Sequence, residues 1–169
     1  MKKHFLIALF IGISTNIFAQ DWEVPKHYTL EGAEDYTQYE GDIIQAATWL
    51  RDNSPAIDIQ KYQDAAQFVI KWVNGSPTVT VMITPIIMDF NKKNPNMLVM
   101  YMASCAKYTL ENNYSKDINA QQKAALKDMV DAYQKQSTMS RDKKMEKLIK
   151  AFDNGTIDNW MQSNMYAGN

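Results

Sequence analysis

The sequence feature that most constrains the fold is a helical spacing of apolar residues, which recurs from Tyr36 to Met165. Apolar side chains fall three or four residues apart in successive segments, so each segment has one apolar face when it is helical. Turn residues separate these segments. The pattern predicts an all-α protein: a compact bundle of about six or seven short helices that follows an irregular N-terminal arm.

The expected arm covers residues 20–34, and a single helical domain covers 35–169. The expected helices are 35–50, 59–75, 78–90, 97–110, 118–136, 140–154 and 157–165. The expected N-terminal caps are Asp58, Ser76, Asn94 and Ser140, with Pro77 and Pro95 directly after two of them. Asn74-Gly75 and Asn154-Gly155 are expected to end their helices with a left-handed glycine. Residues 97–110 are apolar on most sides, which predicts a central, buried helix.

Residues 78–83 allow two interpretations. Their sequence, Thr-Val-Thr-Val-Met-Ile, alternates polar and apolar residues, as a strand does. No other segment is a strand partner, and an isolated strand leaves its main-chain groups unpaired. We therefore expect a helix over 78–90 that is distorted near Pro85.

The first 19 residues predict export. Lys2 and Lys3 precede an apolar run from Phe5 to Ile13, and the small Ala19 follows shortly after. This order is typical of a cleavable signal peptide, residues 1–19, and the run is too short for a membrane anchor. No cysteine follows the cut, so lipid attachment there is excluded. We expect a protein without a membrane span after signal removal, located in the periplasm or outside the cell.

Charge and cysteine content exclude several classes of function. Removing Lys2 and Lys3 from 18 basic residues leaves 16 against 19 acidic ones, a net charge of −3 with histidine neutral. Such a chain is a poor ligand for nucleic acid or for an anionic membrane surface. Cys105 is the only cysteine, so no intramolecular disulfide forms. Its apolar surroundings in the sequence predict a buried thiol that fills space in the core.

One resemblance adds to this interpretation. The runs Phe68–Pro77, Lys92–Leu98 and Ala106–Asn112 resemble a family of small, signal-bearing bacterial helical proteins. The likeness spans roughly residues 60–165 and implies an exported, all-helical protein. The family has no assigned activity, so the resemblance implies no site residue.

Candidate chemistry is sparse, and we expect neither a catalytic constellation nor a cofactor or metal site. His27 is the only histidine after signal removal, and the arm gives it no orienting partner. The acidic residues Glu31, Glu34, Asp35, Glu40 and Asp42 are favoured near helix N-termini by the backbone dipole. The sulfurs of Met97, Met100, Met102 and Cys105 suit Cu(I), but a helix points them in different directions. Methionines that fill gaps in the core explain them better.

The aromatic residues of the arm and first helix are the best candidates for partner binding: Trp22, Tyr28, Tyr36 and Tyr39. Packing of these rings on the domain is the favoured alternative. The sequence thus predicts a non-enzymatic exported helical domain that binds an envelope or extracellular partner, such as an envelope protein. Two alternatives remain open. One is an envelope enzyme, hydrolase-like, with a dispersed Asp/Glu site; the other is a carrier of an apolar ligand or a soft metal.

Overall fold

The computed structural model describes residues 22–166, and within that range it contains eight helices and no strand. The prediction of an all-α bundle is therefore confirmed. The arm runs without helix to Gly32, after which the helices follow in the order α1 (Ala33–Gln38), α2 (Glu40–Asp52), α3 (Ile59–Gly75), α4 (Pro85–Lys93), α5 (Met97–Glu111), α6 (Ile118–Lys135), α7 (Lys143–Asp153) and α8 (Ile157–Asn164).

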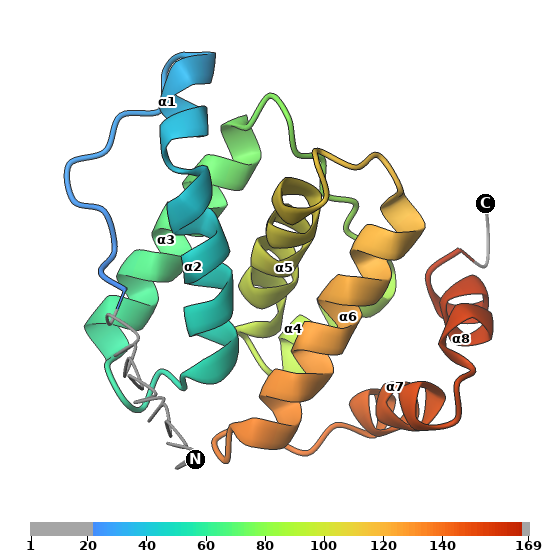
Figure 1. Ribbon diagram of the computed structural model, residues 1–169. Coiled ribbons are helices and arrows are strands. Elements are labelled where there is room, and N and C mark those ends of the chain that lie inside the picture. The colour runs from blue at the N-terminus through green and yellow to red at the C-terminus, as the bar shows by residue number, and fades with distance from the viewer. Residues whose placement is uncertain (1–21, 167–169) are drawn as a thin grey trace, which may run out of the picture.

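Helix α5 is central, as its apolar sequence predicts. It lies between α2 and α3 on one side and α6 on the other (Figure 1). Met97, Met100 and Cys105 face a cluster formed with α4, α6, α7 and α8. Met102 and Ala106 face a second cluster, formed with the arm, α2 and α3. Because one helix contributes to both clusters, the two halves of the core are joined through α5.

The helix expected over 35–50 is two helices. Tyr39 ends α1 and precedes the first residue of α2, with φ −100° and ψ 7°. At this break the Tyr39 ring packs edge-on against Phe68 of α3, with ring centroids 5.9 Å apart. The apolar spacing continues through the break, so the sequence pattern did not reveal it.

The prediction of a helix over 78–90 is wrong for its first half. Residues 76–84 are extended or irregular, and α4 begins at Pro85. Proline fits the first turn of a helix because its missing N–H has no partner there, and it holds Thr84 in the extended region (φ −102°, ψ 162°). Tyr101 of α5 donates to the Met82 carbonyl and Gln121 of α6 donates to the Thr80 carbonyl, so part of the main chain of this segment is bound by side chains rather than by a partner strand.

Three of the four expected N-caps are wrong: two caps lie two residues further along the chain, and Ser76 is instead the C-cap residue of α3. Asp58 caps α3 as predicted, accepting the Lys61 N–H at 2.9 Å. Helix α5 begins after Asn96 rather than Asn94, and α7 after Asp142 rather than Ser140. The Asn94 side chain instead bridges to another segment: its amide group accepts the Ser140 N–H at 2.7 Å and donates to the Ser140 carbonyl at 3.1 Å. Asn94 and Ser140 thus bind each other across 46 residues of chain, while Asp142 caps α7 locally by accepting the Lys144 N–H at 2.8 Å.

Only one of the two glycines expected to end a helix in a left-handed conformation does so. Gly155 has φ +66° after α7, as a left-handed cap requires. Gly75 instead remains inside α3, with Ser76 as the C-cap residue. A Cβ on Gly75 would lie 1.9 Å from the Tyr36 hydroxyl, so the glycine is needed for close packing rather than for a left-handed turn.

Candidate functional site

Trp22 anchors the arm to α2. Its indole N–H donates to the Asp42 carboxylate at 3.1 Å, and its ring lies 6.5 Å from that of Trp49. The side chain is buried. Trp22 therefore contributes to the packing of the arm, the role favoured for it from the sequence.

The three tyrosines predicted to bind a partner are half-buried and pack on the same cluster. Tyr28 and Tyr39 both meet the Phe68 ring edge-on, at 5.0 and 5.9 Å. Tyr36 lies 6.1 Å from the Trp72 ring and donates its hydroxyl proton to the Leu30 carbonyl. Each ring thus has a structural contact and retains some exposed surface. Their role in partner binding remains a prediction.

The arm and the N-terminal part of α3 enclose a groove of about 530 Å³, which we call the arm–α3 groove. Residues 23–28 form one wall. The other wall consists of Asp58, Gln60, Lys61, Asp64 and Gln67. Both charge signs line the groove, and the Lys61 ammonium lies 3.5 Å from the Glu23 carboxylate. His27, in the arm wall, has φ +58°, a left-handed conformation that is uncommon for a residue other than glycine.

An apolar pair lies next to this groove in the chain. Ile57 and Ile59 flank the groove residue Asp58, and their side chains are 71% and 58% exposed. The apolar spacing of α3 predicts an inward position for Ile59, which the structure instead exposes, and that spacing gives no signal of the groove. Polar residues at positions 60, 64 and 67 share one face of α3, which is ordinarily a solvated face. Only the position of the arm makes that face one wall of a groove.

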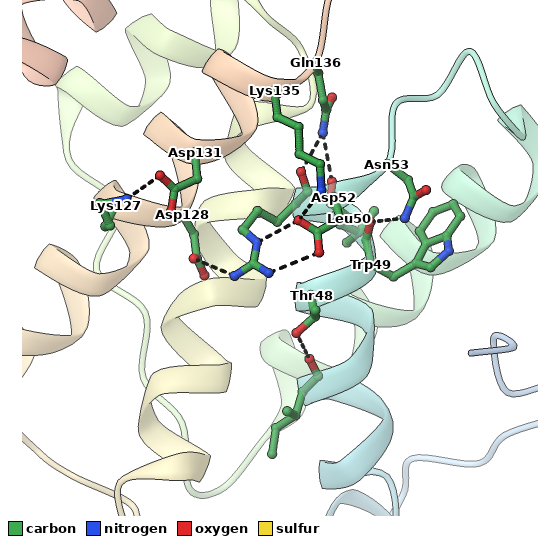
Figure 2. A network of polar contacts seen from close by, with 12 residues as sticks. Thr48, Trp49, Leu50, Asp52, Asn53, Lys127, Asp128, Asp131, Lys135 and Gln136 are labelled. Carbon is green, nitrogen blue, oxygen red and sulfur yellow. Dashed lines mark hydrogen bonds and ion pairs between the residues drawn. The ribbon is translucent and has the colours of Figure 1, made fainter. Parts of the chain in front are cut away.

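A second polar constellation joins the end of α2 to α6 (Figure 2). The Arg51 guanidinium donates two hydrogen bonds to Asp52, both at 3.1 Å, and one to Asp128 at 3.2 Å. Lys135 adds an ion pair with Asp52 at 3.1 Å. The Gln136 amide donates to the carbonyls of Leu50 and Arg51, which lie at the C-terminus of α2. The Arg51 hydrogen bonds hold the pKa of the Asp52 carboxyl below its ordinary value. These contacts are structural: they connect two helices.

We expect the Asp128→Asn substitution to lower the free energy of unfolding by about 0.5–1 kcal/mol, because it removes the charge from a part-buried pair while keeping the side-chain size. The loss should shrink in 1 M salt, which screens charges. Asp131→Asn is the matched control, since Asp131 pairs with Lys127 on the exposed surface of the same helix. Urea denaturation measures both, and an equal cost for the control would contradict the role of the network.

The acidic residues of the first helices have structural roles. The Asp35 carboxylate accepts the N–H groups of Gly32 and Glu31, both at 2.9 Å, and these hydrogen bonds lower its pKa. Glu40 accepts the Tyr114 hydroxyl at 2.9 Å. Within residues 22–166, no group of three or more His, Cys, Asp or Glu side chains is placed to hold a metal ion.

The sulfur-bearing residues divide between the two core clusters. Met97, Met100 and Cys105 lie in the cluster with α6, whereas Met102 lies in the cluster with α2 and α3. All four are buried among apolar side chains, as expected for residues that fill the core. Burial raises the pKa of the Cys105 thiol well above its ordinary value, and the contact with Tyr101 offsets only part of that rise.

The comparisons with known proteins add no assignment to this geometry. No protein-family model, no curated protein and no solved structure matches the chain. The signal peptide predicted over 1–19 lies outside the residues that the structure describes. Among the helices that it does describe, none is long and apolar enough to cross a membrane.

Proposed function

We propose that this protein is a non-enzymatic exported helical domain that binds a protein partner of the cell envelope or the extracellular space through the arm–α3 groove. Export rests on the sequence of residues 1–19. The observation that carries the binding proposal is the groove itself, with charged walls and an exposed apolar pair beside it. A protein partner could bury Ile57 and Ile59 while its polar groups meet the charged walls.

This arrangement matches the anatomy of protein interfaces, in which a few apolar anchors are surrounded by a polar rim. The groove walls supply donors and acceptors of both charge signs from Glu23, Lys26 and Asp64. Tyr28, one of the aromatic residues singled out in the sequence, lies in the arm wall with part of its ring exposed. The arm is itself held by aromatic packing, so the groove is largely formed before a partner arrives.

The test compares partner binding by a variant at the exposed isoleucines next to Asp58 with binding by a variant at an exposed isoleucine elsewhere on α3. Mature protein, beginning at Gln20, is immobilised and used to capture proteins from envelope extract, and the captured partner is then purified for titration calorimetry. We expect the double variant Ile57→Ser/Ile59→Ser to bind the partner at least ~10-fold more weakly, a loss of about 1.4 kcal/mol. The control is Ile70→Ser, because Ile70 is 40% exposed and lies on the same helix as Ile59 but roughly 16 Å further along it, away from Asp58.

Thermal unfolding of all variants separates binding from folding. Because the three isoleucines are exposed, their substitution should leave the melting temperature nearly unchanged. If the double variant binds the purified partner as tightly as the Ile70→Ser control does, the groove is not the binding site and the proposal is wrong.

A further inference from the structure

The ten methionines of residues 22–166 differ widely in exposure. Seven of them are buried in the core: Met97, Met100, Met102, Met129, Met145, Met161 and Met165. Met139 is partly buried and packs against one core cluster. Met82 and Met88, in contrast, are 46% and 41% exposed. Small solutes can therefore reach these two side chains far more readily than the other eight.

Local structure explains why these two methionines face solvent. In α4, Met88 lies about 200° around the helix from both Ile86 and Phe90, which are buried, so Met88 is on the outer face. Met82 lies just before α4, where the Tyr101 hydroxyl donates to its carbonyl at 3.0 Å. Both side chains project from a main chain that is held in place, so their exposure is a property of the fold.

The chain around these methionines is apolar at the surface. Ile83, between them in the sequence, is 44% exposed, and no charged residue occurs from Trp72 to Met88. Oxidation of a thioether to a sulfoxide converts an apolar side chain into a polar one. In the core this change disrupts packing, whereas an exposed methionine has few packing contacts to lose. Oxidation of Met82 and Met88 therefore alters the polarity of the surface and leaves the core intact.

The single cysteine does not compete for an oxidant. Peroxides react with the thiolate form of cysteine, and susceptibility follows thiolate character and exposure. Cys105 is fully buried, and burial raises the pKa of its thiol well above the ordinary value. Its sulfur thus stays protonated and shielded, so the exposed methionines are the sulfur groups open to a mild oxidant.

We propose that Met82 and Met88 form a reversible oxidation site at which this protein reacts selectively with peroxides. A lone pair of the thioether sulfur attacks one peroxide oxygen, the O–O bond breaks and an S–O bond forms. With hydrogen peroxide, sulfur loses two electrons, the peroxide gains them, and the departing hydroxide takes the remaining proton and leaves as water. A sulfoxide reductase with a dithiol reverses the change: the dithiol becomes a disulfide and the oxygen leaves as water. Neither methionine is among the residues that line the arm–α3 groove, so this site is separate from the proposed binding site.

Limited oxidation followed by mass spectrometry tests the selectivity. Mature protein, beginning at Gln20, is treated with hydrogen peroxide, and peptide mapping measures sulfoxide formation at each methionine over time. We expect Met82 and Met88 to react at least ~10-fold faster than any of the seven buried methionines, because the buried sulfurs are shielded. In urea-unfolded protein the difference should vanish. The double variant Met82→Leu/Met88→Leu keeps apolar side chains of similar volume and should lose the two fast reactions.

Two further measurements test the consequence for the fold and the reversibility. Protein oxidised at both sites should keep its melting temperature and elute earlier from a hydrophobic interaction column, and the double leucine variant should show no such shift after the same treatment. Methionine sulfoxide reductases MsrA and MsrB with dithiothreitol should restore the original mass and elution. The proposal is overturned if a buried methionine of the folded protein oxidises as fast as Met82 and Met88. It is also overturned if oxidation at these two sites lowers the melting temperature by ~5 °C or more, or if the reductases do not restore the thioethers.

Discussion

Replacing Trp72 with alanine is expected to lower the free energy of unfolding by about 3–5 kcal/mol, the range for truncating a large buried aromatic side chain. Trp72 is fully buried in the cluster of the arm, α2 and α3. Its indole N–H also donates to the Tyr36 carbonyl at 2.9 Å, at the end of α1. The substitution thus leaves a cavity and removes a hydrogen bond that holds the short first helix against α3. A loss of this size is a large share of the roughly 5–15 kcal/mol typical of a domain.

Trp72→Phe is the matched variant, since it keeps an aromatic ring and loses the indole N–H. We expect it to cost less than Trp72→Ala, with the remaining loss due to the smaller ring and the lost indole hydrogen bond to the Tyr36 carbonyl, which keeps only the Tyr39 N–H at 3.2 Å. Urea denaturation followed by far-ultraviolet circular dichroism measures both variants. A cost below about 1 kcal/mol for Trp72→Ala would mean that this cluster does not hold the arm and α1 in place.

The helices could be predicted from the sequence where the local spacing of apolar residues determines them. Helical spacing identified α6 over nearly its full length, and the apolar sequence of 97–110 correctly predicted a central helix. The errors occur where distant side chains decide the conformation. Residues 76–84 are not helical, and Lys116, Gln121 and Tyr101 bind the carbonyls of three of them. No local pattern encodes those contacts.

The candidate site shows the same limit. The sequence identified Trp22, Tyr28, Tyr36 and Tyr39 as unusual, and the structure places all four in packing contacts. The sequence did not identify the arm–α3 groove, because a groove between an irregular arm and a helix depends on where the arm packs. Pro25 and the aromatic residues indicate an arm that packs on the domain, but not which helix face it covers.

The alkaline stability of the protein should depend on Cys105. Burial raises the pKa of this thiol above the value near 9 expected in the unfolded chain. The thiol is therefore neutral in the folded protein at a pH where the unfolded chain ionises. Its contribution to stability is complete below pH 9 and is lost as pH rises above 9, because ionisation then favours the unfolded state. The loss is about 1.4 kcal/mol per pH unit, or about 2 kcal/mol by pH 10.5.

The variants Cys105→Ala and Cys105→Ser isolate this contribution, because neither new side chain ionises below pH 11. Each variant is expected to be less stable than the original protein at pH 7, since the site is fully packed. Between pH 9 and 10.5, however, the free energy of unfolding should fall more steeply for the original protein than for either variant. Lysine ion pairs and the tyrosines that do not contact Cys105 also respond in this range, but they are common to all three proteins and cancel in the difference. Burial raises the pKa of Tyr101, which does contact the thiol, so Tyr101 stays neutral in the folded proteins over this range. Parallel pH profiles would mean that the thiol ionises in the folded protein as readily as in the unfolded chain, and Cys105 would then be a reactive residue rather than part of the core.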